Sequence, residues 1–197
     1  MRTKTRTFRK GFSLGEVLLS VAVLVIGVLP IFATISHSLK ISIDDQRLIV
    51  ASGLAQEGVE LVQNVRDNNV LHGTDTFTGW LPASGSSWSS CRVDFGDPVV
   101  TAPISNRIAC SGAGANNYDL TVMASGQYRG LYLHQGAAGL FKRRIFLDYS
   151  STDEKLSVVS AAYWGVSFAP QNSNEVRNSC NTANQCVFAE TTLTAWR

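Results

Sequence analysis

Residues 9–35 read RKGFSLGEVLLSVAVLVIGVLPIFATI, and this stretch decides how the rest of the chain is organised. From Val17 to Ile35 it contains no charged residue, and counted from Phe12 it is 24 residues long. As a helix those residues would span roughly 36 Å, which exceeds the hydrocarbon core of a bilayer, about 30 Å. We therefore expect the chain to begin with a long helix whose first half crosses a membrane.

The charge before this stretch predicts the orientation of that helix. Residues 1–11 contain no acid and five basic side chains, Arg2, Lys4, Arg6, Arg9 and Lys10. Basic residues on one flank hold that flank in the cytoplasm, so the remainder of the chain is expected on the other side of the membrane. A cleaved secretory signal is disfavoured because the apolar run is long and LPIFATISHS offers only poor small-residue cleavage sites. A plain signal anchor and a leader clipped on the cytoplasmic side both remain.

The residues immediately before the apolar run distinguish between a signal anchor and a leader that is clipped on the cytoplasmic side. Glu16 is a lone carboxylate at the edge of a membrane helix, where it costs on the order of 2–3 kcal/mol and so needs a reason to be present. A basic leader ending in Gly11, then an aromatic residue, Phe12, then a glutamate at the fifth position after the glycine resembles the leader of the type IV pilin and pseudopilin family. Gly15 departs from that pattern, which has an aliphatic residue before the glutamate. We expect this glycine to loosen the first helical turn and to leave the cleavage signal intact.

The resemblance implies a maturation route and a set of partners. A membrane-embedded aspartyl prepilin peptidase would cut after Gly11 on the cytoplasmic face and N-methylate Phe12, and Glu16 would act in assembly. The further partners implied are other pilin subunits through the N-terminal helix, an inner-membrane assembly platform, and membrane lipid before assembly. The implied location is a single-pass inner-membrane precursor with an extracytoplasmic head, and then an extracellular or periplasmic filament.

The function implied is structural. The helical stretch LAQEGVELVQNVRDN and the later stretches KRRIFLDYSS, LSVVSAAYWGV and FAETTLTAW resemble the exposed half of the first helix and the closing strands of a minor pilin. Two alternatives stay open: a pseudopilin of a type II secretion or DNA-uptake machine, and a membrane-anchored binding module that never polymerises. For the last, Trp80 and Trp88 in the Ser/Gly-rich loop Thr74–Ser90 are candidate contact residues, although tryptophans more often pin such a loop to the core.

Beyond the membrane segment the helical pattern continues. In DDQRLIVASGLAQEGVELVQNVRDNN, residues 44–69, apolar or small residues recur at steps of three and four, and the cluster Asp67-Asn68-Asn69 predicts the end of the helix. A stripe at steps of seven also runs along the helix and fits a packing seam. Its members are Ser13, Ser20, Gly27, Thr34, Ile41, Leu48, Ala55 and Val62. Gly27 and Pro30 are expected to bend the helix or to loosen it locally.

The part of the chain after residue 69 has the sequence pattern of a β-rich domain. We predict strands at Tyr118–Ala124, Gly130–His134, Arg143–Tyr149, Leu156–Trp164 and Val187–Ala195, with a turn at Ser150–Lys155. The predicted fold class is α+β: one long N-terminal helix, membrane-spanning in its first half, packed on a C-terminal antiparallel sheet. The resemblance makes this a pilin-like arrangement. The predicted divisions are 1–11, a basic leader; 12–36, a transmembrane or filament-core helix; 37–69, its amphipathic continuation; and 70–197, the extracytoplasmic head.

Four cysteines, Cys91, Cys110, Cys180 and Cys186, all follow the apolar segment. In an exported head they are expected to form two disulfides, for which three pairings exist, and sequence proximity favours Cys91–Cys110 and Cys180–Cys186. If oxidised, the second pair would close the polar loop Gln171–Gln185.

We find no sign of catalysis, and composition argues against several classes. The chain is 45% hydrophobic and 16% charged, which fits a folded domain and excludes a disordered chain or a multi-span membrane protein. Without residues 1–11 it carries 12 basic against 15 acidic side chains, so direct nucleic-acid binding is not expected. No GxSxG, HExxH or phosphate-binding loop is present, and no cofactor is predicted. Acidic turns at Asp94/Asp97 and at Asp67 are weak candidates for a cation, and we predict no metal site.

Overall fold

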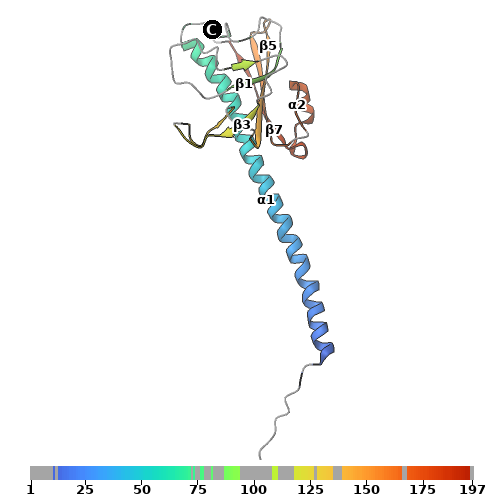
Figure 1. Cartoon of the computed structure of the whole chain (residues 1–197). Helices are drawn as coiled ribbons and strands as arrows, with labels where there is room; N and C mark the ends of the chain where they lie inside the picture. The colour runs from blue at the N-terminus through green and yellow to red at the C-terminus, as the bar shows by residue number, and fades with distance from the viewer. Residues whose placement is uncertain are drawn as a thin grey trace, which may run out of the picture. The chain divides into compact units, whose positions relative to one another are not determined.

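The computed structural model describes residues 11, 13–71, 73, 76–77, 81, 87–93, 108–110, 118–126, 128–134, 139–165 and 168–195. In chain order these residues form α1 (Leu14–Leu71), β1 (Ser87–Val93), β2 (Ile108–Cys110), β3 (Asp119–Val122), β4 (Tyr132–Leu133), β5 (Phe141–Ser150), β6 (Lys155–Tyr163), α2 (Ser173–Ser179), a 3-10 turn η2 (Thr182–Asn184) and β7 (Cys186–Thr194). The chain separates into two compact units, Met1–Asp45 and Gln46–Arg197. The long helix α1 contributes to both (Figure 1).

α1 is continuous over 58 residues, including Pro30 in its interior. It ends later than the sequence predicted: Asp67, Asn68 and Asn69 lie within the helix, where the side chain of Asn68 donates to the carbonyl of Asn64 at 2.8 Å. The end is set by Gly73, which has a φ of 70° and whose N–H donates to the carbonyl of Val70 at 3.0 Å. Glycine adopts this left-handed conformation without strain and commonly closes helices. The division at residues 36 and 37 inside the helix stays a prediction.

The sheet has seven strands among the described residues and is antiparallel throughout. β5 lies at its centre and pairs with β6 over nine of its ten residues, from Lys142 opposite Tyr163 to Ser150 opposite Lys155. The opposite side of β5 is shared, with β3 pairing near its start and β1 near its end. β7 continues the sheet beyond β6, β2 beyond β1 and β4 beyond β3. With α1 packed on this sheet, the layout is α+β, as predicted.

One face of the sheet packs on the outer part of α1. Val59, Val62 and Val65 of α1 join Ile145, Leu147, Leu156, Val158 and Leu193 of the strands in one buried cluster. Nearer its middle, Ala51, Leu54 and Ala55 pack against Leu120, Phe141 and Ala162. Ala55 and Val62 belong to the seven-residue stripe of the sequence, so the outer end of that stripe is used within this unit.

Gly58 marks the closest approach of α1 to the sheet. A Cβ atom at this position would lie 2.2 Å from the hydroxyl oxygen of Ser160 on β6 and 3.1 Å from Cδ of Arg143 on β5. Real Cβ atoms do not approach other atoms so closely, so only glycine allows the helix to sit at this depth.

The second face of the sheet is covered as well. Phe146, Val159, Ala161 and Tyr163 form a separate buried cluster with Val176 of α2 and with Cys186. In Figure 1 the strands accordingly run between the teal part of α1 and the red helix α2. The alternation of side chains along β5 places Arg144 on the face opposite Ile145 and Leu147. Arg144 is on that face but is buried there: it donates to the carbonyl of Pro170 and stacks over the ring of Tyr118, 4.1 Å from its centroid.

Two sequence predictions about the body need correction. The five predicted strands all have counterparts, but β1 and β2 were missed, and the end of the predicted loop Thr74–Ser90 is strand from Ser87 onward. β1 reads SWSSCRV, and its serines resemble loop composition; pairing with β5 overrides that local preference. The polar segment Gln171–Gln185 is not simply a loop, because it contains α2 and η2. The start of α2 has a signal in the sequence, an asparagine three residues before a glutamate. Asn172 is the N-cap of α2, and its side chain accepts from the N–H of Glu175 at 2.8 Å.

The contact at Gly58 gives a direct test of helix docking. Gly58→Ala should lower the free energy of unfolding of the unit by about 1–3 kcal/mol, because its new methyl group overlaps Ser160. Gly53→Ala is the matched control: it adds the same methyl group to the same helix where nothing lies within 4 Å, and should raise stability by up to about 1 kcal/mol. Urea unfolding of the full chain in detergent micelles, followed by near-ultraviolet circular dichroism, measures both. Equal shifts in the two variants would contradict the packing described.

Candidate functional site

The predicted cleavage region lies directly before α1. Gly11 is exposed, and Phe12 lies outside the described residues. The carbonyl of Ser13 accepts hydrogen bonds from the N–H groups of Glu16 at 3.0 Å and Val17 at 3.2 Å, which starts the helix. The helix begins at Leu14, one residue before Gly15, so this glycine does not delay its start. Glu16 is exposed in the first turn, where the exposed N–H groups of the helix favour a negative charge.

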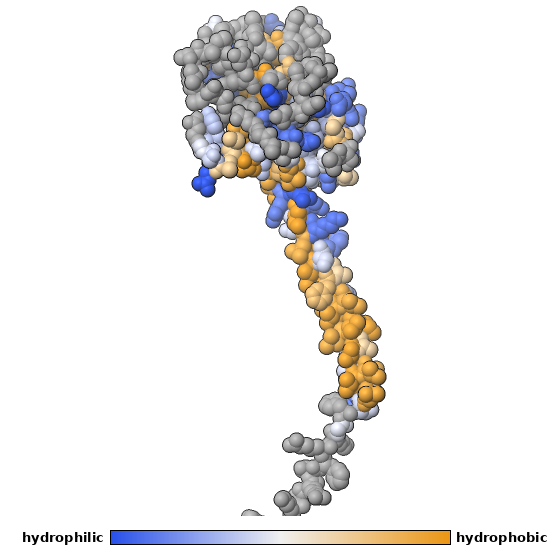
Figure 2. Space-filling model, viewed as in Figure 1, coloured by the Kyte–Doolittle hydropathy of each residue, from blue (hydrophilic) through white to orange (hydrophobic). Residues whose placement is uncertain are grey.

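The segment that follows is apolar on all sides. Among the described residues α1 is the one helix long and apolar enough to cross a membrane, judged by length and composition. None of the residues in its most apolar stretch is buried within the chain. Figure 2 shows this part of the helix as an almost unbroken orange surface. In water such a surface is costly, so it is expected to contact lipid or other apolar helices.

The hydroxyl groups in this segment are satisfied inside their own helix. Ser20 donates to the carbonyl of Glu16 and Thr34 to that of Pro30, both at 2.7 Å, and Ser36 donates to that of Phe32 at 2.9 Å. Each bond spans four residues and leaves no donor to be buried without a partner. Ser20 and Thr34, two members of the seven-residue stripe, can therefore face lipid or a neighbouring helix without an unpaired O–H group.

Arg143 ties the outer part of α1 to the sheet. Its side chain is fully buried and donates to the carbonyls of Val93 on β1 at 2.8 Å and Leu54 on α1 at 3.4 Å. Nη1 also lies 3.3 Å from a carboxylate oxygen of Glu57, which is itself 39% exposed. A planar guanidinium can serve several acceptors at fixed angles, which a lysine cannot do. Arg143 therefore fixes the register of α1 against β1 and β5.

A second charged group holds α2 to the sheet from the other side. Nε of Arg177 lies 3.1 Å from both carboxylate oxygens of Glu190, and Nη2 lies 3.3 Å from the hydroxyl of Ser157. The hydrogen bond from Arg177 lowers the pKa of Glu190, and partial burial opposes this shift. The pair therefore adds stability above the ordinary pKa of a glutamate, and this is lost as the pH falls through the lowered value. Because both side chains are about one-third exposed, solvent screening keeps the contribution small.

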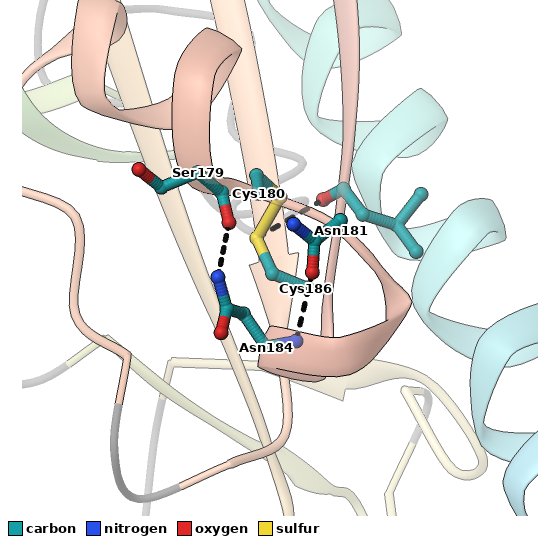
Figure 3. Close-up of a disulfide and its surroundings, with 6 residues drawn as sticks. Ser179, Cys180, Asn181, Asn184 and Cys186 are labelled. Atoms are coloured by element: carbon teal, nitrogen blue, oxygen red, sulfur yellow. Dashed lines mark hydrogen bonds between the residues drawn. A yellow bond between two sulfur atoms is a disulfide. The ribbon is translucent and has the colours of Figure 1, made fainter.

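The structure forms both disulfides that sequence proximity favours. Cys91 and Cys110 lie directly opposite each other on β1 and β2, with Cα atoms 4.1 Å apart. Cys180 ends α2, and its partner Cys186 begins β7. Figure 3 shows the short loop between them, in which the side chain of Asn181 accepts from the N–H of Asn184 at 3.0 Å. The side chain of Asn184 donates to the carbonyl of Ser179 at 2.5 Å, so the loop is held by hydrogen bonds as well as by the disulfide.

The weaker sequence candidates gain no support. No group of three or more metal-ligating side chains occurs within the described part of the chain. Asp67 pairs with Arg66 at 2.7 Å, which accounts for its charge. Asp94, Asp97 and Trp80 lie outside the described residues. Trp88 lies on β1, and its contacts also lie outside what is described.

Arg143 was missed as a contact residue although a signal for it was present. It shares its alternation with Ile145 and Leu147, so the strand pattern places a charge on the apolar face. A charge on such a face needs a partner, and Glu57 in LAQEG is an acid beside the glycine of closest approach.

No protein-family model, curated protein or solved structure matches this chain.

The role of Arg143 can be tested by comparing two substitutions. Arg143→Met should lower the free energy of unfolding by about 1–3 kcal/mol, because the carbonyls of Leu54 and Val93 lose their donor. Arg143→Lys should recover little of this, since one ammonium group does not reproduce the forked geometry. Arg177→Met, at the exposed pair, is the control and should cost less than about 1 kcal/mol. Wild-type stability in Arg143→Lys would show that charge alone is enough.

Proposed function

We propose that the chain is a minor pilin: a structural subunit of a type IV pilus-like filament, made as a membrane-held precursor and cleaved after Gly11. The observation that carries the proposal is the order of features along the first part of the chain. A basic leader ends in Gly11, Phe12 follows, and Glu16 lies in the first turn of a helix that continues to Leu71. Each of these positions matches the family's leader in register.

The structure is compatible with a role for the apolar half of α1 as the part that assembles. Its side chains are exposed along the whole of 14–45, whereas those of the outer half pack on the sheet. In the precursor this apolar surface would lie in lipid. In the filament it would lie among the same segments of neighbouring subunits, where apolar side chains are equally well accommodated. Prepilin peptidase and an inner-membrane assembly platform are the other partners that this route requires.

Glu16 would favour the subunit in the filament over the subunit alone in the membrane. A carboxylate among lipid tails is unfavourable and seeks either a proton or a partner. Cleavage after Gly11 creates such a partner, the positively charged amine of Phe12. A neighbour docked with a suitable axial shift would bring its own Phe12 amine to Glu16. Pairing two charges away from water recovers much of the desolvation cost, whereas an unpaired charge keeps it.

The maturation step is tested on protein isolated from its own host. N-terminal mass spectrometry should find a methylated Phe12 as the first residue. Gly11→Val should abolish cleavage, because the peptidase has to bind a residue with no side chain directly before the cleaved bond. Gly15→Ala is the control, since it changes a glycine that does not flank the cleaved bond, and it should still be cleaved. An intact Met1, or a terminus near Ile35, would overturn the proposal in favour of a signal anchor or a secretory signal.

The assembly step is tested at Glu16. Glu16→Ala should leave membrane insertion and cleavage intact and lower the amount of protein in sheared filaments by about tenfold, the equivalent of one charge pair worth about 1.4 kcal/mol. The measurement compares the cleaved membrane pool with the filament fraction, and Glu60→Ala, on the exposed side of the outer helix, is the matched control. If Glu16→Ala enters filaments as well as wild type, the carboxylate has no part in assembly.

A further inference from the structure

β7 forms one side of the sheet. It pairs with β6 without a break in register, from Lys155 opposite Thr194 to Tyr163 opposite Cys186. Among the described residues no other strand pairs with it. Its outer side is therefore a sheet edge nine residues long.

The hydrogen bonds at both ends of this ladder show which backbone groups of β7 face outward. The N–H of Trp164 donates to the carbonyl of Gln185 at 3.1 Å, and that of Ala195 donates to the carbonyl of Glu154 at 3.2 Å. Hydrogen-bonded and non-bonded pairs alternate along an antiparallel ladder. The odd-numbered residues from Val187 to Leu193 therefore bond to β6. The even-numbered ones direct both N–H and C=O away from it.

The first even-numbered residue behaves as this predicts. The N–H of Cys186 points away from β6 and donates to the carbonyl of Asn181, at 3.1 Å, in the disulfide-closed loop. For Phe188, Glu190 and Thr192 no hydrogen bond within the described residues takes up the outward N–H. Within the described part of the chain, three consecutive outward positions of the edge are thus open.

The sequence of β7 lacks the usual protection of such an edge. Natural edge strands carry a proline, a lysine or a bulge that prevents pairing with another chain. CVFAETTLT has neither proline nor lysine, and its register to β6 is regular. Its one charge, Glu190, is engaged by Arg177 of α2. β-Branched residues make up much of the strand, which favours further strand pairing.

We propose that the open edge of β7 is a docking site for an extended strand of a different protein, added by backbone hydrogen bonds to Phe188, Glu190 and Thr192. Strand addition of this kind takes its affinity from main-chain bonds and its specificity from alternate side chains. On the α1 side the incoming strand would lie beside Ala189 and Thr191, which favours small or β-branched residues. On the other side it would lie beside Glu190, which disfavours an acidic one.

A second copy of β7 is the less suitable partner. Antiparallel pairing of two β7 strands places a two-fold axis perpendicular to the joined sheet, so the parts of α1 that pack on the two sheets would run in opposite directions. That conflicts with anchoring both copies in one membrane, an argument that rests on the proposed function. Pairing centred on Glu190 would also place two carboxylates opposite each other.

The test uses the full chain in detergent micelles and a synthetic probe, a ten-residue peptide of alternating valine and threonine with a lysine at each end. Amide hydrogen exchange measured by NMR should slow by about tenfold or more at Phe188, Glu190 and Thr192 when the probe is added. Thr192→Pro removes one outward N–H without touching the bonds to β6 and should abolish the slowing. Thr192→Val keeps that N–H and should behave as wild type.

The outcomes separate the alternatives. No slowing at the highest soluble probe concentration, or equal slowing in Thr192→Pro, overturns the proposal. Slowing that follows protein concentration without the probe identifies a second copy as the occupant and also overturns it. Should Thr192→Pro fail to fold, a probe methylated at every backbone nitrogen replaces it, and this probe should give no slowing with the wild-type chain. None of these measurements needs leader cleavage or a filament, so the docking site and the filament role succeed or fail separately.

Discussion

The buried guanidinium of Arg143 constrains the arrangement of α1, β1 and β5. A charge removed from water must be met by acceptors, and two of those found here are backbone carbonyls on different elements, those of Leu54 and Val93. A shift of α1 by one residue along the sheet would move both Leu54 and Glu57 away from the guanidinium of Arg143. Apolar side chains alone would tolerate such a slip more readily, because burial of apolar surface is not directional.

Gly58 and α2 complete this arrangement from opposite sides of the sheet. The absent side chain at Gly58 lets α1 approach β6 closely enough for Arg143 to reach the Leu54 carbonyl. On the other face, α2 is N-capped by Asn172, anchored by Val176 and tied by Arg177 to Glu190. Because both faces of the sheet are covered, backbone N–H and C=O groups without a partner are to be sought at its edges, as along β7.

The long helix and the main strands could be predicted because their signals are local. The apolar run before Ile35 and the alternation around Ile145 and Leu147 are periodic patterns within one segment. β1 could not be found in this way, since a strand reading SWSSCRV is held by its pairing with β5 and by the Cys91–Cys110 disulfide, which join residues far apart in sequence. For the candidate site, the leader residues Gly11, Phe12 and Glu16 come from sequence alone. The open backbone groups of β7 depend on a hydrogen-bond register that composition does not reveal.

The position of the disulfide between Cys180 and Cys186 has a consequence for the order of events in biogenesis. The bond joins the end of α2 to the start of β7, and thiols in a reducing cytoplasm remain unpaired. A chain exported as proposed would therefore reach its destination with α2 held by non-covalent contacts, among them those of Val176 and the Arg177–Glu190 pair, and not yet by the disulfide. Until oxidation, Phe146 and Tyr163 beneath α2 would be intermittently exposed to chaperones and proteases. The thiol oxidation machinery of that compartment would then set how long a newly exported subunit stays vulnerable.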